Sequence, residues 1–329
     1  MPTAADPSIR LWLRCDAGAS IGIGHAMRCL ALAQAALEMG FRPRFIGRFN
    51  SEFVARLAAE EIGVELLDDE REFVDRIESG EIAVIDGYHL DPCIAGACRA
   101  RGAVVVVIDD IGAAVGECDL VLNQNLTAST FDYGARQVLR GPRFALLRRE
   151  VLRQRERLAR AGADAVVVST GGGRADLACD VAAGLRRMLP ESVVVRAVVG
   201  VAVDLEFPAG VIGVIGARDM GEELAAATLY VGAAGSTAWE LACLGVPAVL
   251  APIAQNQQAN AIRLEAEGVA VVVDPRADAL VEAAVALYDD GDRRAAMARR
   301  GPELVDGNGA RRVIEVVTAL RHDRTREIQ

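Results

Sequence analysis

The strongest constraint on the fold is an alternation of short apolar runs with helix-like segments that end near a glycine. In the first half of the 329-residue chain, strands are expected at 11–13, 45–46, 64–67, 82–85 and 103–108. Helices are expected between them at 25–39, 52–61, 71–78 and 92–100, each followed closely by a glycine. Glycine commonly ends helices because it adopts the left-handed backbone readily. The alternation predicts βαβ units, and hence a parallel sheet with right-handed crossovers.

A second series of the same kind follows an arginine-rich segment at 148–160, which we interpret as a solvated helix or linker at a domain boundary. Further strands are expected at 166–169, 193–198, 211–215, 229–231, 246–250 and 269–273, and helices from 175, at 222–227, 237–244 and 258–267, and within 277–320. The predicted architecture is α/β, with two Rossmann-like doubly wound domains facing across a cleft. The predicted domains are residues 1–150 and 151–329, with the last helix able to pack back on the first domain.

Composition excludes several classes of function. The net charge of −10 argues against a nucleic-acid partner, since such proteins usually carry a basic face. The chain has no lysine, so it has neither a phosphate-binding Walker lysine nor a lysine for Schiff-base chemistry. Its three scattered histidines and seven cysteines include no CxxC pair or other ligand spacing, so we expect no metal and no cofactor.

Cysteine usage and hydropathy indicate the compartment. Most cysteines lie in apolar runs, as small buried thiols do in a reducing environment. Residues 1–8 lack the basic start of a signal peptide, and no apolar run is long enough to span a bilayer. We therefore expect a cytoplasmic protein without membrane insertion, and the sequence leaves its oligomeric state open, a monomer included.

A glycine-rich turn between the first strand and the first long helix contains the first candidate site. Gly22 and Gly24 open this turn and place His25 at the helix start, where backbone N–H groups favour an anionic or electron-rich ligand. An imidazole, with an ordinary pKa of about 6.5, can take a proton from water at neutral pH. The alternative is a capping or packing histidine. Neither half carries the complete dinucleotide fingerprint, because Met27 and Asp176 stand where its third glycine should fall.

The second candidate site is the segment 232–240, which follows a strand and enters a helix. Ser236 or Thr237 is the expected N-cap, and the N–H groups from Gly235 onward would bind a diphosphate. Glu240 could accept hydrogen bonds from both hydroxyls of a ribose. The alternative is an ordinary capped helix with a solvent-facing glutamate.

Polar residues also follow other strands, at the sheet edge where α/β proteins bind ligands. Asn256 and Gln257 can donate and accept hydrogen bonds, which suits sugar hydroxyls, although a surface turn is the alternative. The segments 86–89, 109–110 and 123–125 could orient a sugar or water, with structural caps as an equal alternative. We interpret His89 as a neighbour of the site.

Taken in order, these motifs span nearly the whole chain. They comprise Arg14, Asp16, residues 21–33, Asp86, Tyr88, and residues 108–110, 123–125, 145–148, 232–240, 256–257 and 306–309. Together they resemble the UDP-2,4-diacetamido-2,4,6-trideoxy-β-L-altropyranose hydrolases of pseudaminic acid biosynthesis and related spore-coat polysaccharide biosynthesis proteins. One loop departs from that family, because Arg174 stands before Asp176 after the glycines at 171–173.

The resemblance implies a glycosyltransferase-B fold and metal-independent hydrolysis of a UDP-sugar, in which water attacks the anomeric carbon with inversion. It implies that His25 is the base that activates water. The implied substrate-binding residues are Arg14, Asp16, Gly22, Gly24, Tyr88, Asn256 and Gln257, and the implied UDP-binding residues are Gly235, Ser236, Thr237 and Glu240. Two alternatives stay open: an inverting UDP-sugar glycosyltransferase on the same fold, and a non-catalytic sugar-nucleotide-binding protein.

Overall fold

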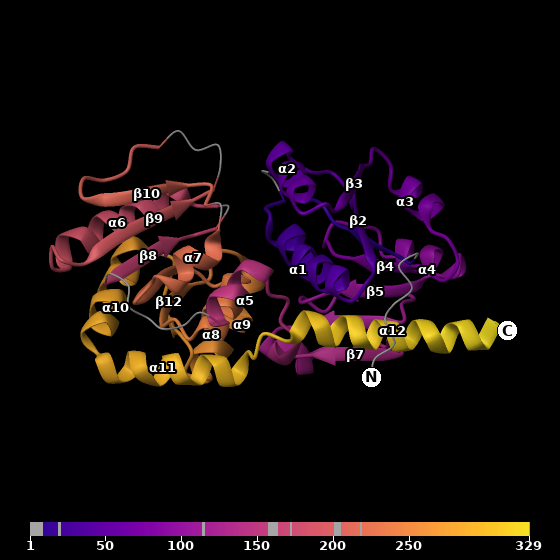
Figure 1. Ribbon diagram of the computed structural model, residues 1–329. Helices are drawn as coiled ribbons and strands as arrows, with labels where there is room; N and C mark the ends of the chain where they lie inside the picture. The colour runs from indigo at the N-terminus through magenta and orange to yellow at the C-terminus, as the bar shows by residue number, and fades with distance from the viewer. Residues whose placement is uncertain are drawn as a thin grey trace. The chain divides into compact units, whose positions relative to one another are not determined.

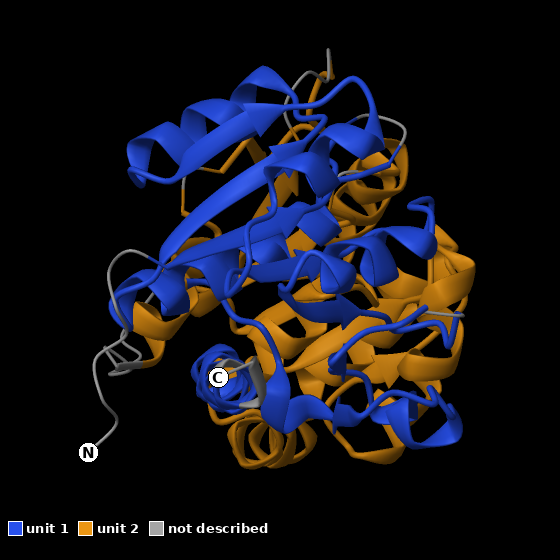
Figure 2. Cartoon of the chain, turned by 90° about the vertical axis from the view of Figure 1, so that its right-hand side faces the viewer, with its two compact units in different colours: residues 1–148, 308–329 blue, residues 149–307 orange. Residues whose placement is uncertain are grey.

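The computed structural model describes residues 9–18, 21–113, 116–156, 164–171, 173–200, 205–217 and 219–328. The chain forms two compact units, which Figure 2 distinguishes by colour. Unit 1 comprises residues 1–148 and 308–329, and unit 2 comprises residues 149–307. The boundary after residue 148 lies close to the predicted one after 150, and residues 308–329 belong to unit 1 because the last helix packs back on its core, as the prediction allowed.

Unit 1 is built on a seven-stranded parallel sheet with the order β3-β2-β1-β4-β5-β6-β7. Its strands are β1 (Arg10–Arg14), β2 (Arg42–Gly47), β3 (Gly63–Leu66), β4 (Ile82–Ile85), β5 (Val104–Ile108), β6 (Leu120–Asn123) and β7 (Gln137–Arg140). Its helices are α1 (Gly24–Glu38), α2 (Ser51–Ala59), α3 (Glu70–Arg76), α4 (Cys93–Ala100) and α12 (Gly309–Ile328), with short 3₁₀ helices η1 (Leu126–Thr130) and η2 (Pro142–Phe144). The sequence interpretation missed β6 and β7, which are only four residues each.

The two faces of this sheet bury separate cores because alternate strand residues point to opposite sides. Leu11 and Leu13 of β1 pack in the core that contains α1 and α12, whereas Trp12 packs in the core that contains α3 and α4. Figure 1 allows these helices to be followed around the sheet. Val313 and Ile314 of α12 are fully buried in the first core, which fixes 308–329 to unit 1.

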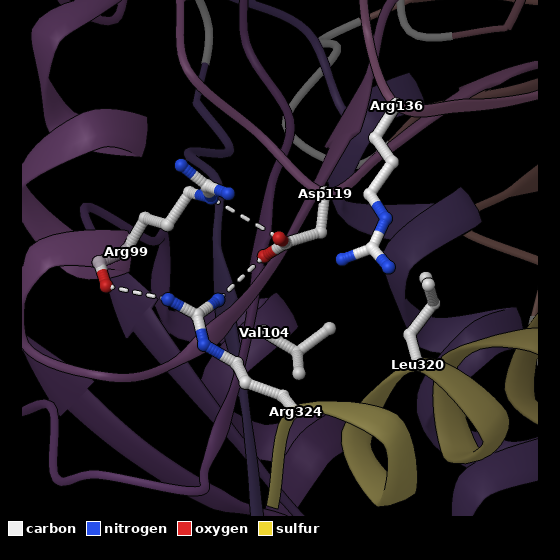
Figure 3. A pocket seen from close by; sticks show the side chains of 6 residues that line it. All are labelled: Arg99, Val104, Asp119, Arg136, Leu320 and Arg324. Carbon is white, nitrogen blue, oxygen red and sulfur yellow. Dashed lines mark hydrogen bonds and ion pairs between the residues drawn. The ribbon is translucent and has the colours of Figure 1, made fainter. Parts of the chain in front are cut away.

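Arginine side chains connect the last turns of α12 by hydrogen bonds to the amino-terminal ends of strands in the same sheet. Arg324 donates to the backbone oxygens of Ala103 at 2.5 Å and Arg99 at 2.9 Å, and to the carboxylate of Asp119 at 2.9 Å. Asp119 is buried and also accepts from the Arg99 side chain at 3.1 Å. Figure 3 shows Arg99, Asp119 and Arg324 beside a cavity of about 70 Å³, which Arg136 also lines.

We expect Arg324→Ala to lower the free energy of unfolding by about 1–3 kcal/mol, because it leaves a buried carboxylate with one cation fewer. Urea denaturation followed by circular dichroism measures the change. Arg311→Ala is the matched control on the same helix, since Arg311 forms only an exposed pair with Glu315 and should change stability by about 0.5 kcal/mol or less. Equal effects of the two substitutions would show that the Arg324 contacts do not stabilise unit 1.

Unit 2 is built on a six-stranded parallel sheet with the order β10-β9-β8-β11-β12-β13. Its strands are β8 (Ala165–Ser169), β9 (Val194–Val199), β10 (Val211–Ile215), β11 (Leu229–Ala233), β12 (Ala248–Ala251) and β13 (Val271–Val272). Its helices are α5 (Arg149–Glu156), α6 (Ala175–Met188), α7 (Met220–Ala225), α8 (Thr237–Leu244), α9 (Gln255–Ala266), α10 (Ala277–Asp289) and α11 (Gly291–Leu304).

The arginine-rich segment is not simply a solvated linker. Its first part forms α5, which packs against α7 and α8 and buries Val151 completely. Residues 157–163 lie outside the described residues. Val151 packs this arginine-rich helix onto unit 2, and Arg155 of the same helix donates to the backbone oxygen of Val305 at 3.4 Å.

Both units have the predicted Rossmann-like, doubly wound architecture. In each sheet the strand order reverses direction once, between β1 and β4 in unit 1 and between β8 and β11 in unit 2. Open α/β sheets bind ligands outside the carboxyl ends of the strands at such a reversal. The two reversals therefore locate one candidate site on each unit.

Candidate functional site

In unit 1, the turn that follows β4 holds a buried carboxylate against the start of α1. Asp86 is fully buried and accepts two hydrogen bonds from Arg28, from Nε and Nη2, both at 2.6 Å. The same carboxylate lies 2.6 Å from Nδ1 of His25. His25 and Arg28 can both reach it because residues three apart lie on one face of a helix.

The charge on Asp86 determines which nitrogen of His25 carries the proton. Burial raises the pKa of Asp86, but the charges and hydrogen bonds of Arg28 and His25 outweigh it and bring the pKa to about 2. An ionised carboxylate only accepts, so Nδ1 of His25 must donate, and in the neutral imidazole Nε2 is then the nitrogen with the lone pair. Arg28 Nη2 also lies 3.1 Å from Nδ1, but in this tautomer both are donors, so that contact is not a hydrogen bond.

Tyr88, in the turn after β4, and Asp110, after the end of the neighbouring strand β5, complete this cluster. Arg28 Nη1 donates to one oxygen of Asp110 at 2.9 Å, and the Tyr88 hydroxyl donates to the other. The ring of Tyr88 meets the ring of His25 edge to face, with centroids 4.6 Å apart. Tyr88 is 42% exposed, whereas the His25 side chain is 12% exposed, so Tyr88 partly covers the imidazole.

The glycines before His25 leave space beside it. Gly22 has a φ of +83°, a left-handed conformation that other residues rarely adopt, and it turns the chain into α1. A side-chain carbon placed at Gly22 or Gly24 would meet no atom of the described residues within 4 Å. The turn therefore borders open space, as room for a ligand requires.

Arg14 and Asp16 lie close together in the interior of unit 1. Both are at least 98% buried: Arg14 is 2% exposed and Asp16 1%. Asp16 accepts from Arg14 at 2.5 Å, from the backbone N–H of Arg48 at 2.7 Å and from Nε2 of His89 at 2.6 Å. Burial raises the pKa of Asp16, but these three donors lower it by more. Both side chains are engaged in internal hydrogen bonds, and Asp16 is the partner of the more exposed His89, so the direct contact of these two residues with a substrate stays a prediction.

The sequence interpretation gave Arg28 no role of its own, treated Asp110 only as one of several polar residues that could orient a sugar or water, and placed His89 as a neighbour of the site. The spacing of His25 and Arg28 on one helix face was the available signal for Arg28. The other contacts join residues more than 20 positions apart, so no local pattern could reveal them.

In unit 2, the candidate nucleotide site lies at the start of α8. Ser236 is the N-cap residue as predicted, but its side chain makes no capping hydrogen bond. A side-chain carbon at Gly235 would lie 3.5 Å from Nε2 of Gln257, so the start of α9 approaches this turn. Gln257 is held by its Oε1, which accepts from the N–H of Ile253 at 3.0 Å. The turn, Ser236 and Gln257 are thus close together.

Glu240 and Asn256 differ in exposure. Glu240 is 6% exposed, so the alternative of a solvent-facing glutamate is wrong, and Asn256 is exposed. Thr237 begins α8 and is partly exposed. These residues belong to unit 2, whereas His25 and Tyr88 belong to unit 1.

The loop after β8 adjoins the same strand reversal in unit 2. Arg174 adopts a left-handed backbone, with φ +56°, and its carbonyl accepts from the hydroxyl of Thr170 at 2.9 Å. The Arg174 side chain pairs with Asp176 on the surface at 3.1 Å. The arginine that departs from the family pattern is therefore engaged with its neighbour in the loop.

Within the described ranges, no group of three or more His, Cys, Asp or Glu residues has the arrangement of a metal site. Among the helices of the same ranges, none is long and apolar enough to cross a membrane.

Comparisons with known proteins support the fold. Residues 211–315 match the glycosyltransferase family 28 C-terminal domain. A search of curated proteins gave no significant match. Among solved structures, MurG of Acinetobacter baumannii is 17% identical with a TM-score of 0.62, and the match covers 94% of this chain and 99% of MurG.

Two further structures are similar over the same extent. The spinosyn rhamnosyltransferase SpnG, complexed with thymidine diphosphate, is 15% identical with a TM-score of 0.66, over 94% of this chain and 100% of SpnG. UGT2 of Phytolacca americana, complexed with UDP-2-fluoro-glucose and pterostilbene, is 13% identical with a TM-score of 0.65, over 94% of this chain and 99% of UGT2. With its two parallel-sheet Rossmann-like units, the chain has the glycosyltransferase-B fold.

Proposed function

We propose that this chain binds a nucleoside diphosphate sugar, with UDP as the nucleotide, and transfers the glycosyl group to an acceptor hydroxyl. The observation that carries the proposal is the pair of His25 and ionised Asp86, which leaves Nε2 of a partly exposed imidazole as a base. The match of residues 211–315 to a glycosyltransferase domain supports transfer over other uses of the nucleotide sugar.

Unit 2 would hold the nucleotide and stabilise the leaving group. The N–H groups at the start of α8 and the hydroxyl of Ser236, which does not cap its own helix, are suitable donors for a diphosphate. Such donors favour the charge that develops on the departing diphosphate. Gln257 lies beside the same turn and Glu240 is the candidate partner of the ribose hydroxyls.

Unit 1 would activate the nucleophile. Nε2 of His25 takes the proton of the acceptor hydroxyl while its oxygen attacks the anomeric carbon from the face opposite the diphosphate. The bond from the anomeric carbon to the diphosphate oxygen breaks, its electron pair leaves with the diphosphate, and the configuration inverts. Asp86 holds the ring in the required tautomer and stabilises the imidazolium that forms, as carboxylates do for catalytic histidines.

Hydrolysis of a UDP-activated 2,4-diacetamido-2,4,6-trideoxy sugar is the second candidate, in which water replaces the acceptor. The signature at 21–33 favours it, since this segment carries the resemblance to sugar-nucleotide hydrolases and lies outside the matched range 211–315. The open space beside Gly22 and Gly24 is compatible with water as the nucleophile. A non-catalytic sugar-nucleotide-binding protein is the remaining alternative.

One experiment separates these functions. The purified protein is incubated with a panel of UDP-sugars, 2,4-diacetamido sugars included, with and without alcohol acceptors such as glycerol and octyl glucoside. Phosphorus and anomeric proton NMR follow the release of UDP and the configuration of the product. UDP release that requires an acceptor supports transfer, and release without one supports hydrolysis. Binding of UDP without any turnover would overturn both.

A further inference from the structure

A second pocket of unit 1 lies on the other face of the sheet from His25. It has a volume of about 70 Å³ and lies between the turn after β4, the start of α4 and the end of β5. Its walls are mainly apolar and include Ile85, Leu90, Ala95 and Val107, and its carboxylates are Asp91 and Asp109. The volume exceeds the roughly 30 Å³ that one water molecule occupies in the liquid, so the pocket can admit a small organic group.

Asp109 supplies the unusual feature of this pocket. It is 4% exposed, and its Oδ1 accepts from the N–H of Ile111 at 3.0 Å. Its Oδ2 is buried and has no hydrogen-bond partner among the described residues. Buried polar atoms are nearly always hydrogen-bonded, so an unpartnered carboxyl oxygen in a pocket needs an explanation.

Strand alternation separates Asp109 from the His25 cluster. Val107 packs in the core beneath α4, and Asp109 directly follows the last residue of β5, where its N–H still donates to the backbone oxygen of Leu122 at 3.0 Å, so it continues the alternation toward that face. Ile108 packs in the opposite core, together with α1. Tyr88 adjoins both sites, because it lines the pocket and its ring contacts His25.

The charges that line the pocket indicate the ligand. Burial raises the pKa of Asp109 and the charge of Asp110 adds to this, while the N–H groups of Ile111 and Ala113 and the charge of Arg28 lower it by less. A positive charge in the pocket would stabilise the ionised form of the Asp109 carboxylate. No arginine or histidine is among the residues that line the pocket. The hydroxyl of Tyr88 already donates to Asp110, so it does not supply the missing donor.

We propose that this pocket is a binding site for a primary ammonium group carried on a short aliphatic stem. The ammonium donates to Oδ2 of Asp109 and is attracted by Asp91, while the stem packs against the apolar walls. Because Tyr88 connects the pocket to His25, the ammonium would belong to the sugar or acceptor of the proposed reaction. Only this last step rests on the proposed function.

Titration with two probes of similar size tests the ligand class. Propylammonium and 1-propanol are added separately to protein labelled at the alanine methyl groups, and the NMR signal of Ala95 is followed. We expect saturable shifts with propylammonium and an affinity at least about tenfold lower for propanol, because charge-assisted hydrogen bonds to a buried carboxylate are the stronger ones. Equal affinities would overturn the proposal, as would water alone in the pocket, seen as no saturable shift with either probe.

Asp109→Asn keeps the size of the side chain and removes its charge. We expect this substitution to weaken propylammonium binding by about tenfold or more and to leave propanol binding unchanged. Asp75→Asn is the matched control, since Asp75 is an exposed residue of α3 outside the pocket. Unchanged propylammonium binding in a folded Asp109→Asn protein would contradict the proposal. A chain that takes up propylammonium but turns over no nucleotide sugar would contradict the proposed function alone.

Discussion

Replacement of His25 by asparagine should lower kcat by about 100- to 10,000-fold, the range in which a general base contributes to catalysis. Asparagine can still reach Asp86 with an N–H donor, but it has no basic nitrogen to take the proton of the nucleophile. The KM for the nucleotide sugar should change little, because the proposed diphosphate contacts lie at 235–240 in unit 2. Steady-state kinetics on the substrate found in the UDP-sugar panel measure both constants.

Two other histidines provide controls for this loss. His322 lies on the exposed surface of α12, so His322→Asn should retain full activity. His89 is also paired with a buried carboxylate, that of Asp16, although through Nε2 where His25 uses Nδ1, which makes His89→Asn the closer comparison. A larger loss of kcat in His89→Asn than in His25→Asn would show that His25 is not the base. A shared loss of nucleotide binding would indicate a disturbed fold instead.

The fold could be predicted from the sequence because its signals are local. Each segment that the sequence predicted as a strand overlaps one, and the glycines after 39, 61, 78 and 100 follow the ends of helices as expected. The strands β6 and β7 were not predicted, because no recognisable helical segment separates them. The place of 308–329 in unit 1 depends on packing against strands some 200 positions earlier, which periodicity does not reveal.

The candidate site could be predicted only in its parts. The carboxylates at 86 and 109–110 were recognisable as residues that follow strands, but their partners depend on the sheet order β1-β4-β5. Because β4 lies next to β1 in that order, Asp86 reaches His25 and Arg28 at the start of α1. Strand alternation directs Asp109 toward α4, away from this cluster. Arg14 and Asp16 are a different case. Their motif resembles that of a binding site, but in the structure the two side chains are hydrogen-bonded to each other and Asp16 is also bonded to His89.

Removal of the Asp86 side chain should strongly destabilise unit 1. Arg28 is 6% exposed, and Asp86→Ala would leave its guanidinium with Asp110 as the one remaining carboxylate. Breaking one partner of a buried ion pair typically lowers the free energy of unfolding by about 3–5 kcal/mol. The double variant Asp86→Leu with Arg28→Met removes both charges, and we expect it to recover part of this loss. A double variant less stable than Asp86→Ala would contradict the account.

The ion pair should also make stability depend on pH in a narrow acidic window. The pKa of Asp86 is lowered from 3.8 to about 2 in the folded state, so folding favours the ionised carboxylate. Its contribution is therefore complete above a pH of about 4 and is lost as the pH falls toward about 2. A shift of this size corresponds to about 2 kcal/mol. In Asp86→Asn the carboxylate is absent, so its free energy of unfolding should decline less steeply than that of the unsubstituted protein across this window, as urea denaturation at successive pH values would measure. Parallel curves would mean that Asp86 is not held ionised by Arg28 and His25, and the assignment of the His25 tautomer would lose its basis.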